Sequence, residues 1–274
     1  MGAVVSVQSG SAIATHIFTS VGPAGATLLR VGFGAIILLG LWRPRPGQYG
    51  RHAYRDAILF GLTTAAMNLS FYSALNRIPL GIAVTLEFLG PLTLAVLGSR
   101  RPLDLLWVGF AATGVLLLTP LGGHSIDPVG LLLALMAGIF WALYILFSAR
   151  VGRAFTGGNG LAIALLAGSL ALLPVGLVTA GPRLFDGRVL LIGLGVGLLS
   201  AVIPYSLEME ALRTISTRLF GVLMSSEPAV GAVVGLILLR QVLSLRAVAA
   251  IILIMAASIG ATRSTSEPSI PPPA

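Results

Sequence analysis

The sequence predicts an all-α membrane protein with ten transmembrane helices, arranged as two inverted five-helix repeats. Of its 274 residues, 56% are hydrophobic and only 9% are charged, whereas soluble domains carry about a quarter charged residues. The apolar residues fall into long runs separated by short gaps, and several motifs recur half a chain apart. A soluble protein of this length needs a far more charged surface, so lipid must surround most of these side chains.

A transmembrane helix needs about 20 apolar residues to cross the hydrocarbon core of a bilayer. The longest gap between apolar runs extends only from Arg43 to Arg55, so no soluble domain is inserted. The first run is short and polar: either it lines an aqueous cavity, or the true start lies upstream. The predicted spans are residues 3–19, 24–42, 56–75, 81–98, 103–121, 129–149, 159–179, 189–207, 217–239 and 246–262.

An internal repeat divides these spans into two groups of five. Matching residues recur at offsets of 135 to 137, and the common offset carries more weight than any single match. Five spans per unit is an odd number, so the second unit must enter the membrane from the opposite side. Inverted repeats are typical of secondary transporters, whose binding site lies between the halves near the midplane. The matching pairs are Gly25 with Gly160, Gly61 with Gly197, Ala74 with Ala211, Ile78 with Ile215 and Pro91 with Pro228.

We therefore expect a first repeat over residues 1–121 and a second over 129–262. Residues 263–274, rich in Ser, Pro and Glu, are expected to form a disordered cytoplasmic tail.

The basic residues are all arginines, and they predict the orientation of the chain. With both termini in the cytoplasm, eleven arginines lie inside, five lie outside and Arg30 lies within a span, which follows the positive-inside rule. The net charge of +8 therefore indicates membrane topology rather than nucleic-acid binding, in which arginines cluster on one face.

Several chemistries are excluded by the residues themselves. The sequence has no cysteine, so disulfides and thiolate metal sites are ruled out. It also lacks a phosphate loop and a zinc-protease motif. We expect no enzyme activity, no cofactor and no bound metal.

Four segments carry a resemblance to a known family. They are NRIPLGIAVTLEFLGP at 76–91, SRRPLD at 99–104, PYSLEM at 204–209 and LMSSEPA at 223–229. Together they resemble the bacterial threonine/homoserine exporters of the EamA branch of the drug/metabolite transporter superfamily, over nearly the whole chain. The resemblance implies ten helices in two inverted units and proton-coupled export of amino acids across the inner membrane. Members often carry a glutamate at the end of the ninth span, where this chain has Leu239 and Arg240.

Ionisable groups inside the spans are the first candidates for the binding site, because each costs about 2.5–3.5 kcal/mol at the bilayer centre. Glu87 lies in the middle of a span and could bind a substrate ammonium group or a proton; the alternative is a structural pair with Arg30. Glu227 precedes Pro228, which cannot donate to the helix and loosens the turn. It could serve as a ligand beside a freed carbonyl, or the proline could serve packing alone.

Arg30 has Leu165 as its counterpart in the repeat, so symmetric packing does not require it. It could receive a substrate carboxylate with its two-pronged guanidinium, or reach toward the outer interface. Glu208 falls within the family-like 204–209 motif, whereas a solvated pair of Glu210 with Arg213 is the simpler interpretation of that residue.

Polar and aromatic groups in the spans are expected to line the transport path. Aromatic rings beside a substrate ammonium would add cation–π attraction. The candidate substrate- and proton-binding residues from this class are Asn68, Tyr72, Trp141, Tyr144 and Tyr205, with Gln8 and His16 as further polar groups.

The leading hypothesis is a secondary exporter of small amino acids, with a proton and the lipid bilayer as its other partners. The alternatives are export of a different metabolite or drug by the same fold, and a passive channel. A homodimer is left open.

Overall fold

The computed structural model describes residues 2–45, 47–97, 103–118, 127–205, 207–208 and 223–264, and every regular element among them is helical. The first part contains α1 (Gly2–Ala14), η1 (Thr15–Ile17), α2 (Phe18–Trp42), α3 (Arg51–Leu75), α4 (Leu80–Glu87), α5 (Leu89–Leu97) and α6 (Leu103–Leu118). The second contains α7 (Pro128–Ala154), α8 (Asn159–Ala180), η2 (Gly181–Phe185), α9 (Gly187–Gly197), the π-helical η3 (Leu198–Val202), α12 (Glu227–Leu239) and α13 (Leu245–Ser264).

Six helical segments are long and apolar enough to cross a membrane, and three shorter apolar helices accompany them. The prediction of an all-helical, multi-pass membrane protein is thereby confirmed, while the count of ten spans stays a prediction. The long segments are Gly2–Trp42, Arg51–Leu75, Pro128–Ala154, Asn159–Phe185, Gly187–Tyr205 and Leu245–Arg263; the shorter ones are Leu80–Leu94, Leu106–Leu118 and Glu227–Leu239.

The first long segment, Gly2–Trp42, covers two predicted spans with a kink between them. Gly22 has φ 68° and ψ 171°, and Pro23 follows it. A side chain at Gly22 would be strained in this left-handed region, and Pro23 cannot donate to the helix ladder. The kink falls in the predicted gap between residues 19 and 24.

Helix α7 presents its large apolar side chains outward and its small residues inward, the reverse of a soluble protein. Its buried positions include Gly130, Ala134, Ala137 and Gly138. Small residues at the contacts let membrane helices approach closely, while large apolar side chains face lipid. The exposed stripe consists of Leu132, Met136, Ile139, Leu143 and Leu146.

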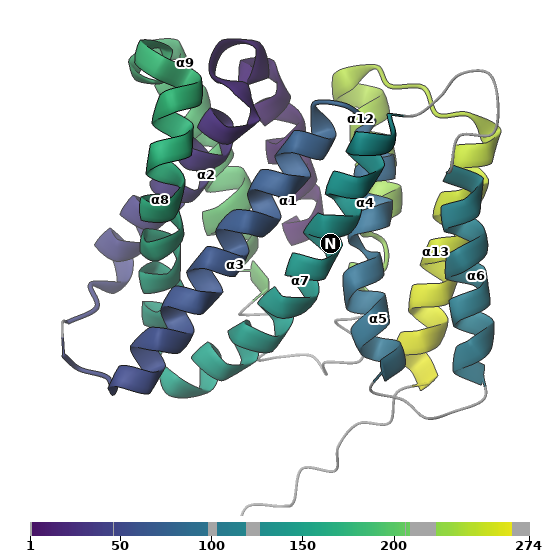
Figure 1. The fold of residues 1–274 in the computed structure, drawn as a ribbon, viewed down its shortest axis with the longest axis horizontal. Helices are drawn as coiled ribbons and strands as arrows, with labels where there is room; N and C mark the ends of the chain where they lie inside the picture. The colour runs from purple at the N-terminus through teal and green to yellow at the C-terminus, as the bar shows by residue number, and fades with distance from the viewer. Residues whose placement is uncertain are drawn as a thin grey trace, which may run out of the picture.

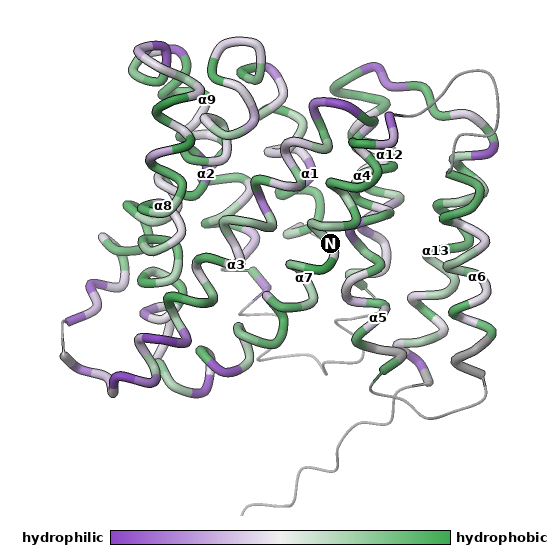
Figure 2. The backbone as a smooth tube through the Cα atoms, viewed as in Figure 1, coloured by the Kyte–Doolittle hydropathy of each residue, from purple (hydrophilic) through white to green (hydrophobic). Residues whose placement is uncertain are grey.

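The helices form a single elongated bundle in which the two halves of the chain interleave (Figure 1). Helix α2 packs on α8, α3 packs on both α7 and α8, and α4 packs on α12. Helices α6 and α13 lie side by side at one end of the bundle. Hydrophilic residues gather mainly at the helix ends and connections (Figure 2), as expected for a chain that crosses lipid repeatedly.

Helices α3 and α8 touch backbone to backbone at Gly61. A Cβ atom there would overlap the carbonyl oxygen of Ala164, and a Cβ on Gly168 would lie 2.6 Å from the carbonyl oxygen of Gly61. Neither carbonyl is the movable end of a flexible side chain, so the two helices would have to separate.

Gly61→Ala is therefore expected to destabilise the protein by about 1–3 kcal/mol, the usual cost of overpacking. The measurement is thermal unfolding in detergent, with loss of the purified monodisperse protein as the readout. Gly109→Ala is the matched control, because a Cβ at Gly109 has no atom of the described residues within 4 Å. Equal melting temperatures for the two variants would contradict the close contact.

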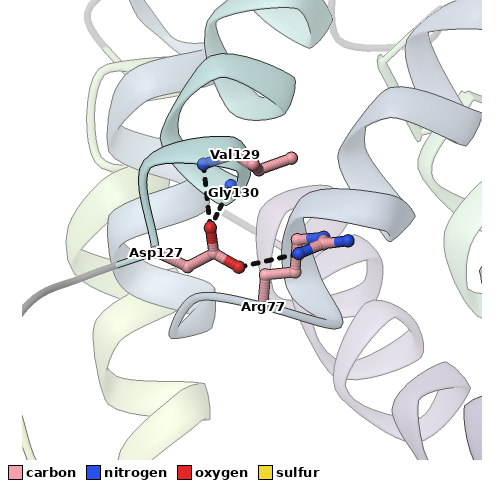
Figure 3. Close-up of polar contacts among 4 residues, drawn as sticks. All are labelled: Arg77, Asp127, Val129 and Gly130. Atoms are coloured by element: carbon pink, nitrogen blue, oxygen red, sulfur yellow. Dashed lines mark hydrogen bonds and ion pairs between the residues drawn. The ribbon is translucent and has the colours of Figure 1, made fainter.

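The start of α7 is capped by Asp127 (Figure 3). Its carboxylate accepts hydrogen bonds from the backbone N–H groups of Val129 at 2.8 Å and Gly130 at 3.4 Å. Arg77, which follows α3, donates to the other carboxylate oxygen at 2.8 Å. The bond from Arg77, and then those from the backbone, hold the pKa of Asp127 below its ordinary value.

Asp127→Asn keeps a good capping residue but removes the charge, so we expect a lower melting temperature near neutral pH, by less than for Gly61→Ala. Because the folded pKa is depressed, the charge stabilises the protein above the unfolded pKa of about 3.9. That contribution is lost as the pH falls through the lower, folded value. Melting curves of both proteins should therefore converge in acid; a constant difference at every pH would contradict the assignment.

Some predictions fall outside the described residues: most of the 99–104 motif, the Glu210–Arg213 pair and the tail from residue 265. At the start of that tail, Arg263 and Ser264 continue α13 beyond the predicted end at 262. Arg240 ends α12 in the left-handed conformation, with φ 55°.

Candidate functional site

Glu87 lies at a break between two helices. Helix α4 ends at Glu87 and α5 begins at Leu89, because Pro91 has no N–H to pair with the carbonyl of Glu87. That carbonyl lies against α7, where a Cβ on Gly138 would be 2.8 Å from it. Glu87 itself is buried, so the break places a carboxyl group inside the bundle between α4 and α7.

Glu227 lies at the start of α12 and is also buried, with 5% of its surface exposed. Helices α4 and α12 run in opposite directions. A Cβ on Gly81 would lie 2.8 Å from the Cα of Ala232, and one on Gly231 would lie 3.1 Å from Val84 Cγ2.

Val84 precedes Glu87 by three residues and Gly231 follows Glu227 by four, so both glutamates lie one turn from the same contact. They are within electrostatic range of each other, and Glu208 is within range of Glu227.

Arg30 is buried on α2, with 5% of its surface exposed. Its Nη2 donates to the carbonyl of Ser200 at 3.0 Å, and its guanidinium lies over the ring of Tyr72, 5.3 Å from the centroid. Ser200 belongs to the π-helical η3, a local widening that is common at functional sites. A guanidinium has five N–H donors, and Arg30 forms no ion pair with the described residues. It is therefore available to an anion.

Two aromatic side chains of α7 pack against rings near Glu87 and after η3. Tyr144 stacks on Tyr205 at 6.1 Å between centroids, and Trp141 meets Phe88 edge-on at 5.4 Å. Tyr205 lies within electrostatic range of Arg30. Phe88, next to Glu87, and Tyr205, which follows η3, therefore both contact aromatic residues of α7.

Asn68 occupies the same face of α3 as Tyr72. Its amide donates to the carbonyl of Thr64 at 2.7 Å, one turn back in its own helix. Tyr72 is fully buried, and its hydroxyl has no hydrogen-bond partner among the described residues. His16, by contrast, is exposed and contacts the carbonyl of Ile13 in its own helical turn, so it does not join these groups.

Most of the predicted site residues thus lie in one central network. The guanidinium of Arg30 lies over the ring of Tyr72 and within electrostatic range of Tyr205, which stacks on Tyr144. Glu227 lies within electrostatic range of both Glu87 and Glu208. Asn68 and Trp141 adjoin this network through their helix neighbours. Sequence reasoning missed Ser200 and its carbonyl; the available signal was Pro204, four residues later, which has no N–H to pair with that carbonyl.

The chain is similar to known transporters in sequence and to a solved structure in fold. Residues 128–263 match the EamA-like transporter family. The chain is 42% identical over 262 residues to the threonine/homoserine exporters RhtA of Salmonella typhimurium and Escherichia coli, covering 95% of this chain and 88% of theirs. A solved crystal structure, 22% identical, has a TM-score of 0.66 and covers 96% of this chain and 95% of that one. The last comparison supports the fold alone.

The match to these exporters covers 95% of the chain and therefore spans both of its halves. The chain belongs to the EamA-like transporter family and is a multi-pass membrane transporter rather than an enzyme.

Proposed function

We propose that this protein is a secondary transporter that exports small amino acids, of the threonine and homoserine type, across the bacterial cytoplasmic membrane. The observation that carries the proposal is the set of buried charged side chains, Arg30, Glu87 and Glu227, with the partly buried Glu208 within electrostatic range of Glu227. A zwitterionic amino acid presents one carboxylate and one ammonium group, which complement Arg30 on one side and Glu87 with Glu227 on the other. The relatives named as threonine/homoserine exporters support the same substrate class.

In this proposal the chain forms ten spans, with a first repeat over 1–121 and an inverted second repeat over 129–262. The packing pattern supports it. The contact of α3 with α7 has its counterpart in that of α1 with α9 and η3, and the contact of α4 with α7 in that of α1 with α12. The pairs α2–α8, α4–α12 and α6–α13 are each their own counterparts. Such a pattern is expected when two copies of one unit are related by a two-fold axis in the membrane plane.

The arginine distribution supports an orientation with both termini in the cytoplasm. Export is coupled to proton entry, with the buried glutamates as the groups that exchange a proton for the substrate ammonium. A carboxyl group suits this exchange, because its neutral form is tolerated in an apolar site and its charged form binds a cation.

The test is transport by the purified protein in liposomes. With a proton gradient imposed, labelled threonine should move against its own concentration gradient, and a proton ionophore should abolish that movement. Absence of threonine and homoserine transport, at confirmed insertion, would refute the substrate. A panel of other metabolites would then identify the cargo, and movement only down a gradient would indicate a channel.

A further inference from the structure

Two buried polar atoms on α1 have no partner in the described part of the chain. Gln8 and Ser11 are 3% and 1% exposed, and the Oε1 atom of Gln8 and the Oγ atom of Ser11 make no hydrogen bond there. Leaving such a group buried and unpaired is destabilising. The residues are three apart and share one face of the helix, so two buried polar atoms without a hydrogen-bond partner lie close together.

The opposite face of α1 is held against η3. The hydroxyl of Ser6 donates to the carbonyl of Leu199 at 2.7 Å, and a Cβ on Gly10 would lie 3.0 Å from the Cβ of Leu199. With α1 anchored on that side, the face that carries Gln8 is directed toward α12 and α4.

The amide of Gln8 lies where α1, α4 and α12 meet. A Cβ on Gly231 would be 3.6 Å from Gln8 Oε1 and 3.1 Å from Val84 Cγ2. Gly231 is one turn from Glu227, and Val84 is one turn from Glu87. The unpaired amide oxygen therefore belongs to a third helix, α1, and meets α4 and α12 about one helical turn away from each glutamate.

The chemistry of the unpaired atoms narrows what they can bind. A carboxylate only accepts hydrogen bonds, so it cannot satisfy Oε1 of Gln8. An ammonium group pairs more strongly with the nearby carboxylates than with an amide. A hydroxyl both donates and accepts, so it can pair with Gln8 through either amide atom and with the Ser11 hydroxyl as well.

We propose that Gln8, assisted by Ser11, recognises the side-chain hydroxyl of the transported amino acid, a role that rests on the proposed function. Glu87, Glu227 and Arg30 bind the charged groups common to all amino acids. Gln8 then selects threonine and homoserine over amino acids of similar size that have no hydroxyl. A site built to bind a hydroxyl rejects the analogue without one, because its buried polar groups stay unpaired.

The experiment compares threonine with valine, in which a methyl group replaces the hydroxyl at nearly the same volume. Each is used unlabelled to compete with labelled homoserine for transport in liposomes. The wild-type protein should prefer threonine strongly. Gln8→Met, which keeps the length of the side chain but removes the amide, should lower the ratio of threonine to valine affinity on the order of tenfold or more. Ser11→Ala should lower it less.

Ser169→Ala is the matched control. Ser169 is buried on α8, but its hydroxyl is already paired with the carbonyl of Leu166 at 2.8 Å, so the ratio should not change. Melting temperatures establish that each variant is folded, and Ser11→Ala, which removes a single atom, reports the ratio if Gln8→Met does not fold.

An unchanged ratio in the folded variants, or equal competition by threonine and valine in the wild-type protein, would overturn the role of Gln8. Either result leaves amino-acid export standing. Failure of the wild-type protein to transport homoserine or threonine at all would instead refute the proposed function on which the role depends.

Discussion

Replacing Glu87 with glutamine is expected to abolish accumulation of threonine against its gradient, with a loss of transport of about a hundredfold. The substitution keeps the size and shape of the side chain but removes the exchangeable proton and the charge that binds the ammonium group. Losing one partner of a buried charged contact costs about 2–5 kcal/mol, and about 2.7 kcal/mol corresponds to a hundredfold change in affinity.

The measurement is proton-driven uptake into liposomes alongside downhill exchange of labelled threonine. Asp56→Asn is the control, because Asp56 pairs with the exposed Arg55 at 3.4 Å near the start of α3, away from the central network. Its transport should match that of the wild-type protein. Uphill transport by Glu87→Gln at the wild-type rate would show that Glu87 takes no part in coupling. Equal downhill flux through both proteins, with no uphill transport by either, would indicate a channel.

Replacing Arg30 with lysine should weaken threonine binding on the order of tenfold or more, although the positive charge is retained. Lysine lacks the planar fork that matches a carboxylate, so the exchange is not conservative at such a site. It also loses the stacking of the guanidinium over Tyr72 and the fixed bond to the carbonyl of Ser200.

Threonine amide, which has no carboxylate, separates recognition from folding. The arginine-to-lysine change should weaken competition by threonine and leave competition by threonine amide nearly unaltered. Arg246→Lys is the matched control, since Arg246 also donates to a carbonyl of another helix, Leu116 at 3.2 Å, but that hydrogen bond is exposed. Equal weakening of both competitors by Arg30→Lys would indicate a packing role for Arg30 and contradict carboxylate binding.

Much of the fold follows from local features of the chain. The run of apolar residues from 129 to 149 lies within one helix, and its alternation of small and large residues indicates which side faces lipid. The break at Glu87 follows from Pro91, four residues later, because proline removes the hydrogen bond that the Glu87 carbonyl would accept. Kinks at Gly22 and Pro23 are likewise local. These features depend on backbone chemistry within a few residues, which the sequence displays directly.

The arrangement of the site depends on contacts between residues far apart in the chain. Arg30 meets the carbonyl of Ser200 across 170 residues. Pro204, four residues after Ser200, has no N–H to pair with that carbonyl, but nothing in the linear sequence shows that Arg30 is its partner. Gln8 is another example. The sequence indicates a polar residue in the first span, but only the packing of α1 against Gly231 and Val84 places its amide beside the glutamates.

The sequence by itself thus determined that the chain is a helical membrane protein and which few charged groups lie within it, because burying charge in lipid is costly enough to make each one conspicuous. Only the tertiary structure decided which of these groups meet. Helices without charged surfaces pack through small residues and close backbone contacts, and such contacts, between Gly81 and Ala232 or between Gly138 and Glu87, leave almost no mark on the linear sequence.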